Sequence, residues 1–417
     1  MLAKNILILS LIHVVRLVLP LLLIPVLTRR IDASDFGIYM YTISFAAWLS
    51  IFIEYGFSIS STREVASAEG KAEIRRTIKG TQSAKLILSG LTLPVMAIAA
   101  VYVPVFDGHM YWAGAAWVLG LLSALSPIYY FQGRENLRMV GLTETASGLL
   151  TLIAVLFFVH DIDDFYRLPL IMAVARFFSF ALLTTTMYRE AGIGIGELLN
   201  FGDGWHALKR GFNIFIFQGA VSFYTSFNVV FLGFFCTPLQ VGAYAAAERL
   251  MRAGLGFINQ FSNAIFPRLN SLRARKSLEM EQMRKKVLAA FFLLGLTGVI
   301  VTWYAAPLVA QYMFPSNYAE VAGMVKILAL LIPAVALSNV LGFQYLLVDR
   351  REKLFNLIIS AAAVLNIGLA YMMVKQWQAN GMAYSWVIVE WVVAVLLAVA
   401  VFCYPKKDGS KVTVQSA

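Results

Sequence analysis

Apolar residues recur along the chain in twelve runs, each about the length of a helix that crosses a lipid bilayer. Short polar or basic segments separate the runs, which predicts an all-α polytopic membrane protein with about twelve transmembrane helices. The runs are Ile6–Leu27, Phe36–Phe57, Ser83–Val103, Tyr111–Phe131, Leu142–Val159, Leu168–Tyr188, Gly211–Cys236, Val241–Phe266, Val287–Ala310, Val321–Leu347, Phe355–Val374 and Gly381–Cys403.

Composition and charge support a membrane protein. The 417 residues are 60% hydrophobic and 14% charged, which is more apolar than a soluble fold of this length needs, so lipid must be part of the solvent. Lys and Arg gather in alternate loops, as they do on the cytoplasmic side of membrane proteins. Both termini are therefore predicted to be cytoplasmic, and the net charge of +11 requires no nucleic-acid partner.

A polar break near the middle divides the chain into two predicted lobes of six helices each. We expect an N-lobe over residues 1–188, a cytoplasmic linker over 189–210, a C-lobe over 211–405 and a cytoplasmic tail over 406–417. The lobes echo one another, because Phe36-Gly-Ile-Tyr39 resembles Val241-Gly-Ala-Tyr244 and Arg134-Glu-Asn-Leu137 resembles Arg351-Glu-Lys-Leu354. Six helices a lobe give both halves the same polarity, so the repeat should be parallel, around a central cavity.

Charges far from helix ends indicate a cavity, because an ionised side chain in hydrocarbon is costly. Arg16 lies near the middle of the first predicted helix and shares a face with His13 and Pro20. Arg176 and Glu390 lie near the middle of two others. The eighth helix adds Arg249 and a polar arc, and the seventh a second polar side. The arc comprises Glu248, Arg252, Asn259 and Asn263, and the second side comprises Gln218, Ser222, Thr225 and Asn228.

Four of these buried charges are arginines and two are glutamates, so the cavity is predicted to be cationic and to attract an anion. The polar side chains, with His13, are candidate sugar contacts, although helix-to-helix hydrogen bonds are the alternative. Glu248 and Glu390 are candidates for coupling to H⁺ or Na⁺. Charges nearer the helix ends are expected to be structural, namely Glu54, Lys85, Glu144 and Lys326. The four histidines have no metal-ligand spacing, so no metal or cofactor is predicted.

Several segments resemble the Wzx-type flippases of O-antigen and polysaccharide repeat units, within the multidrug and oligosaccharidyl-lipid exporter superfamily. The most specific segment is Glu54-Tyr-Gly-Phe-Ser-Ile-Ser-Ser-Thr-Arg-Glu-Val-Ala66. Others are Pro20–Pro25, Asp35–Tyr39, Phe131–Glu135, Val241–Arg249 and Ala264–Arg268. The resemblance implies two six-helix lobes around a cationic cavity that opens alternately to each side of the bacterial inner membrane. On position and charge, the resemblance extends to Arg16, Arg249 and Arg252 as substrate contacts, and the mid-helix charge of Arg176 adds a fourth predicted substrate-binding arginine.

The expected substrate is an undecaprenyl-pyrophosphate-linked oligosaccharide, moved from the inner to the outer leaflet within membrane lipid and in contact with the polysaccharide polymerase machinery. Each sugar hydroxyl costs about 1–3 kcal/mol to desolvate, so a hydrophilic path is needed. One alternative is a cation-coupled multidrug exporter of the same superfamily, which the excess of buried arginine disfavours. Another is a polymerase or ligase acting on the same lipid, which should need a long outer loop that this sequence lacks.

Overall fold

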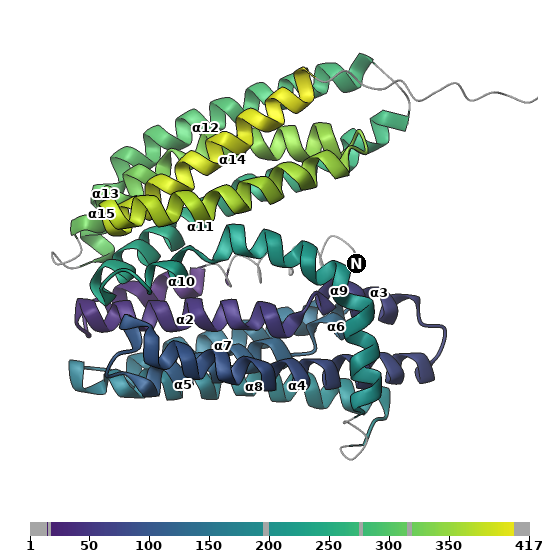
Figure 1. The fold of residues 1–417 in the computed structure, drawn as a ribbon, viewed down its shortest axis with the longest axis vertical. Coiled ribbons are helices and arrows are strands. Elements are labelled where there is room, and N and C mark those ends of the chain that lie inside the picture. The colour runs from purple at the N-terminus through teal and green to yellow at the C-terminus, as the bar shows by residue number, and fades with distance from the viewer. Residues whose placement is uncertain (1–14, 16–17, 195–199, 275–277, 315–318, 404–417) are drawn as a thin grey trace, which may run out of the picture.

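The structure, a computed structural model, describes residue 15 and residues 18–194, 200–274, 278–314 and 319–403. Within its helices, the side chains of residues 213, 217–225, 263–264, 273–274, 278 and 319 lie outside the description. The described part of the chain contains helices and no strand, as the apolar runs predict. It is a multi-pass membrane fold with two lobes, seen in Figure 1 as two layers of long helices.

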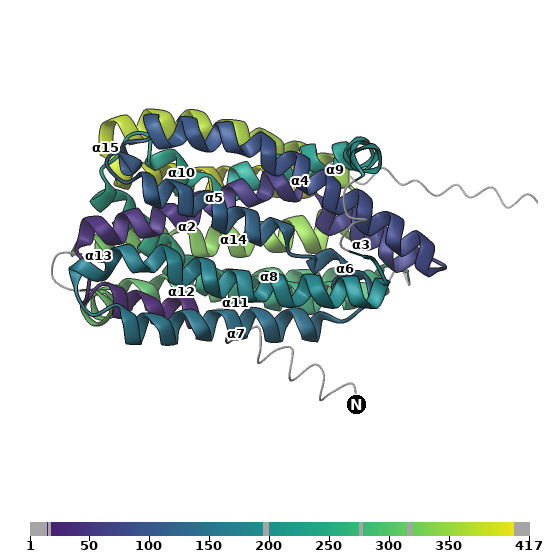
Figure 2. The ribbon, with the colours of Figure 1, turned by 90° about the horizontal axis from the view of Figure 1, so that it is seen from below.

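The N-lobe is built from α2 to α8. Its helices are α2 (Ala33–Glu54), α3 (Phe57–Ser67), α4 (Lys71–Tyr102), α5 (Met110–Leu125), α6 (Ile128–Gly133), α7 (Leu137–Phe158) and α8 (Leu168–Ala191), with 3₁₀ turns η1 (Pro104–Phe106) and η2 (Ile162–Arg167). Figure 2 shows the long helices of this lobe running side by side, with α2 packed on α5 and α7 on α8.

The second half of the chain begins with α9 (Phe201–Ser226) and α10 (Asn228–Leu232). The C-lobe follows as α11 (Pro238–Ala274), α12 (Leu278–Met313), α13 (Ala319–Ala329), α14 (Leu331–Asn339), the π-helical turn η5 (Val340–Leu347) and α15 (Glu352–Phe402). In Figure 1 this layer lies close to α2 at one end of the molecule and diverges from it toward α3 and α6.

The predicted linker is partly helical. The Asn200 side chain caps α9 by accepting hydrogen bonds from the backbone N–H groups of Gly202 and Asp203, at 3.1 and 3.3 Å. The helix then lies against α4, where a Cβ on Gly204 would approach within 3.0 Å of the Ser83 Cβ. Residues 201–210 of the predicted linker are therefore the first turns of a helix, and the exact lobe boundaries stay a prediction.

Eight of the described helical segments are long and apolar enough to cross a membrane. Half of the first predicted span lies outside the described residues, and its described part, Val18–Leu27, is a shorter apolar helix. The helices α9 and α11 are too polar for that criterion, and α15 joins the last two predicted spans. Gln378 breaks α15 with φ 51° and ψ −129°. A Cβ on Gly381 would lie 2.1 Å from the Met373 carbonyl oxygen, although eight residues of continuous helix extend about 12 Å. The chain therefore reverses there, and the total of twelve spans is consistent with the fold.

The internal repeat is visible in the backbone. Glu135 and Arg350 both have φ 57°, and each lies two residues before the first residue of a long helix. The hydrogen bonds match: Asn136 N–H donates to Phe131 O, and Arg351 N–H donates to Leu346 O, both at 2.8 Å. Asn136 and Arg351, 215 residues apart, are thus equivalent in the structure. The sequence comparison had instead aligned Arg351 with Arg134, two residues earlier.

In the other repeated pair of segments, Phe36–Tyr39 and Val241–Tyr244, equivalent residues contact one another. A Cβ on Gly242 of α11 would lie 2.7 Å from the Cα of Gly37 of α2, and one on Gly37 would lie 1.8 Å from the Pro238 carbonyl oxygen. Only glycine allows backbones to approach so closely. The two lobes therefore meet where the repeat brings its own equivalent glycines together.

Candidate functional site

Two cavities lie beside the α2–α11 contact. The larger, here called the N-lobe cavity, has a volume of about 530 Å³ and is lined by the segment before α2 and by α2, α5, α7 and α8, with Arg249 from α11. The smaller, here called the interface cavity, has a volume of about 250 Å³ and is lined mainly by α2 and α11. Ile43, Ala47 and Arg249 line both cavities, so Arg249 stands at the boundary between them.

Among the described residues that line these two cavities, Arg249 is the cation whose charge is not balanced by an ion pair. Its Nη1 lies 3.7 Å from the Met40 sulfur, and its guanidinium is beside the Tyr39 side chain. Among the residues that the structure describes, no carboxylate forms a salt bridge with it. A guanidinium has five N–H donors in a planar fork that suits phosphate oxygens. Arg249 can therefore accept an anion without displacing a carboxylate.

Arg252 and Glu248 form an ion pair one turn apart on α11. The Arg252 Nη2 and Nε donate to Glu248 Oε1 at 2.5 and 2.9 Å, and both residues line the interface cavity. The guanidinium also lies 4.8 Å from the centroid of the Trp386 ring on α15. Glu390, one turn further along α15, is close enough to act electrostatically on Arg252. Glu248 and Arg252 therefore lie on one face of α11, as their spacing predicts.

Arg176 contributes a second balanced pair, in the N-lobe cavity. Its Nη1 donates to Glu144 Oε2 at 2.7 Å, and the Ser179 hydroxyl donates to Glu144 Oε1 at 3.1 Å. Both charged residues line the cavity. Glu144 was expected to be structural from its place near a helix end, whereas the structure makes it part of a cavity wall. Its sequence signal was the spacing Glu144, Ser147, Thr151, which repeats at one helical turn.

None of the predicted sugar contacts that the structure describes lines the two cavities. Asn228 is buried and accepts from Asn366 at 3.3 Å, and Asn259 accepts from Asn339 at 2.8 Å. Both bonds join helices, and neither residue lines the two cavities. His13 and Arg16 lie outside the described residues, as do the side chains of Gln218, Ser222, Thr225 and Asn263. Their roles stay predictions.

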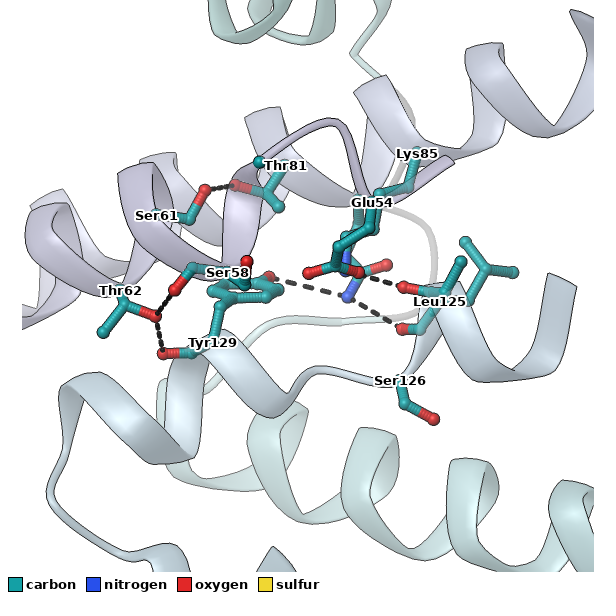
Figure 3. A network of polar contacts seen from close by, with 12 residues as sticks. Glu54, Ser58, Ser61, Thr62, Thr81, Lys85, Leu125, Ser126 and Tyr129 are labelled. Carbon is teal, nitrogen blue, oxygen red and sulfur yellow. Dashed lines mark hydrogen bonds and ion pairs between the residues drawn. The ribbon is translucent and has the colours of Figure 1, made fainter. Parts of the chain in front are cut away.

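The most specific sequence segment, which starts at Glu54, lies in a buried polar network (Figure 3). Lys85 is fully buried and donates to Glu54 Oε2 at 2.8 Å and to the Ala124 carbonyl at 2.6 Å, with the Tyr129 ring centroid at 5.1 Å. Ser61 bonds Thr81 at 2.8 Å in the same region. The network joins α2, α3, α4, α5 and α6, so Glu54 and Lys85 hold helices together and have the structural role that was expected.

The fold and these cavities define a two-lobed, multi-pass α-helical membrane protein with a charged site where its lobes meet. A family model described as "Polysaccharide biosynthesis protein" matches residues 2–273. The chain belongs to this family, which confirms the resemblance drawn from the sequence.

The chain is similar over nearly its whole length to two relatives and to solved structures. A protein named "Putative O-antigen transporter" from Escherichia coli (strain K12) is 26% identical over 95% of each chain. One of the same name from Shigella dysenteriae is 24% identical over 95% of this chain and 99% of the relative.

The solved structure of the lipid II flippase MurJ, in an inward closed conformation, has a TM-score of 0.77 at 14% identity and covers 96% of this chain and 88% of its own. An inward-facing multidrug resistance MATE family transporter has a TM-score of 0.62 at 15% identity, with coverage of 92% and 96%. These two similarities show the fold.

Proposed function

We propose that this protein is a flippase that moves undecaprenyl-pyrophosphate-linked oligosaccharide repeat units from the inner to the outer leaflet of the bacterial inner membrane. The observation that carries the proposal is Arg249, a cation without a carboxylate partner among the described residues, which lines both the N-lobe cavity and the interface cavity. The names of the relatives, O-antigen transporters, support the same substrate class and a transporter instead of an enzyme.

The arginines would act on the diphosphate. Arg249 would bind its oxygens directly, because it lines both cavities. Arg252 and Arg176 would add guanidinium donors while paired with their glutamates, without adding net charge. Arg16 would add a further positive charge. The polyprenyl tail would remain in lipid, where apolar transfer favours it. Glu248 is held by Arg252, and coupling of H⁺ or Na⁺ through Glu248 or Glu390 stays a prediction, as does contact with the polymerase machinery.

The lobes would move by alternating access. They touch at Gly37 and Gly242 at one end and diverge toward α3 at the other (Figure 1). With both termini cytoplasmic, the divergent end would be the inner one, and the structure would correspond to an inward-facing state. An inside-negative potential of 100 mV would then favour outward movement of an anion by about 2.3 kcal/mol per charge.

A multidrug exporter is the second candidate, supported by the fold of the MATE transporter. Such a cavity should present an unpaired carboxylate to an organic cation. In the two cavities, however, Glu144 and Glu248 are both paired with arginines, and Arg249 leaves the lining positive. The electrostatics therefore favour an anionic substrate.

The test is accumulation of lipid-linked oligosaccharide in cells that lack this protein, complemented with Arg249→Ala, Arg249→Lys, Arg252→Ala or Arg16→Ala. Arg138→Ala is the matched control, because Arg138 is exposed and lines neither cavity. We expect repeat units to build up on the inner leaflet with Arg249→Ala at normal membrane levels, and Arg249→Lys to retain part of the activity. Absence of accumulation in the deletion strain, with changed drug sensitivity, would refute the flippase in favour of the exporter.

A further inference from the structure

The N-lobe cavity carries polar groups that the diphosphate does not need. Glu144, Ser147 and Thr151 lie at one-turn spacing on α7 and all line it. Ser50 of α2 and Ser123 of α5 contribute hydroxyls from other walls. The hydroxyls of Ser50, Ser147 and Thr151 donate to backbone carbonyls. Their oxygens remain acceptors for a ligand that donates hydrogen bonds, such as a sugar hydroxyl or water.

The charges of this cavity make it suitable for an uncharged ligand. Glu144 and Arg176 cancel one another at 2.7 Å, so the pair offers strong hydrogen-bonding groups without a net charge. A carboxylate has about four acceptor sites and a guanidinium five donors. The described contacts use two acceptor sites of Glu144 and one donor of Arg176. The remaining groups can bond hydroxyls that both donate and accept, and bonds to charged groups are the stronger kind.

Size and position point in the same direction. A volume of about 530 Å³ falls within the roughly 300–1,000 Å³ of small-molecule sites. Arg249 stands at the boundary of the cavity, so a diphosphate held there would direct its attached group either into the N-lobe cavity or into the smaller interface cavity. Only the first combines the larger volume with several hydroxyl-bearing walls.

We propose that the N-lobe cavity is the saccharide subsite, in which Glu144 and Arg176 bind the hydroxyls of the uncharged sugar next to a diphosphate held at Arg249. Thr151 completes the wall on α7. This inference rests on the proposed function. Apart from His13, the sequence predicted the sugar contacts in the C-terminal half of the chain, and the proposal places them in the N-lobe. It assigns recognition of the lipid anchor and of the sugar to different residues.

The experiment measures binding of two probes to the purified full-length protein in lipid nanodiscs. One probe is undecaprenyl diphosphate alone, and the other is undecaprenyl diphosphate that carries two N-acetylglucosamine residues. In the wild type the disaccharide should tighten binding by about tenfold or more, since hydrogen bonds to charged groups are lost without it. Glu144→Gln, which keeps the shape of the side chain, should bring the ratio of the two affinities close to one. Because it leaves the Arg176 charge unbalanced, it should not weaken binding of the bare diphosphate.

Thr151→Val provides a second, milder variant. The Thr151 hydroxyl donates to the Ser147 carbonyl at 3.0 Å, and that of Thr185 on α8 makes the same kind of bond to Ala181 at 2.7 Å but lies outside the cavity. Thr151→Val should lower the ratio, whereas Thr185→Val should not. Arg249→Gln should weaken both probes equally.

The two proposals fail in different ways. A wild-type ratio of one, or a ratio that Glu144→Gln and Thr151→Val leave intact, would overturn the saccharide subsite while binding of the diphosphate still supports a flippase. If the wild type binds neither probe, the proposed function itself fails, and the subsite fails with it.

Discussion

Alanine at Gly37 should weaken the contact between the lobes. A Cβ there would lie 1.8 Å from the Pro238 carbonyl oxygen, and real Cβ atoms essentially never approach closer than 3.0 Å, so the α2 and α11 backbones must separate by at least about 1.2 Å. The obstacle is backbone, which cannot rotate away as a side chain can. Overpacking of this kind costs about 1–3 kcal/mol.

The assay is thermal stability of the purified protein in detergent, followed as the folded fraction that remains after heating. At about 2 °C per kcal/mol for a large domain, Gly37→Ala should lower the apparent Tm by about 2–6 °C. Gly242→Ala should act similarly, because its Cβ would lie 2.7 Å from the Gly37 Cα. The double variant should lose less than the two single losses together, since both separate the same contact.

Gly254→Ala is the control. Gly254 lies on the same helix α11, and no heavy atom lies within 4 Å of the position its Cβ would take. Alanine is the better helix former by about 1 kcal/mol, so this variant should be at least as stable as the wild type. If Gly37→Ala and Gly254→Ala had the same apparent Tm, the conclusion that α2 and α11 meet at Gly37 and Gly242 would be wrong.

Other contacts lead to further predictions. Lys85→Met alone should destabilise the protein by about 3–5 kcal/mol in the same assay, because it leaves the Glu54 carboxylate without its cation, and Lys85→Met with Glu54→Leu should recover much of the loss. Gln378→Gly should be tolerated at φ 51°, while Gln378→Val should lower the Tm because β-branched residues avoid positive φ. Thr28→Val removes the 2.8 Å hydrogen bond to the Met313 carbonyl, which links the segment before α2 to α12, and should cost about 1 kcal/mol. If Lys85→Met, Gln378→Val or Thr28→Val left the Tm unchanged, the structural feature behind that prediction would be contradicted.

Much of the fold follows from the apolar runs, because a spanning helix must satisfy its own backbone and therefore has a characteristic length. The runs located α2, α7 and α8 to within a few residues at most boundaries. They did not indicate that α4 begins at Lys71, twelve residues before its predicted span at Ser83, because its first turns are polar. Helical structure outside lipid leaves no apolar signal.

The sequence indicated which charged residues lie within the helices, but it did not indicate which residues they pair with. Periodicity on α11 correctly grouped Glu248 with Arg252, since residues one turn apart share a face. It could not pair Arg176 with Glu144, which comes from another helix 32 residues away. Nor could it show that Asn228 bonds to Asn366 across 138 residues. Tertiary packing decides which polar residues face a cavity, and a single sequence does not contain that information directly.

The repeat gives the interface cavity an approximate symmetry that its charges break. Gly37 and Gly242 are 205 positions apart, and the same offset relates Ile43 to Glu248, Ser44 to Arg249 and Ala47 to Arg252, all of which line this cavity. Each charged residue of α11 thus has an uncharged equivalent on α2, so the positive charge of the site comes from one half of the repeat.

This relation predicts that the cation can be moved across the approximate axis. Arg249→Ser should cause lipid-linked oligosaccharide to accumulate, and Ser44→Arg combined with Arg249→Ser should restore part of the transport, because the same charge would enter the same cavity from α2. Ser44→Arg alone, compared at equal membrane levels, shows whether the added side chain blocks the site. If the combined variant were as defective as Arg249→Ser while Ser44→Arg alone was active, the position of the guanidinium on α11, and not the charge of the cavity, would determine binding.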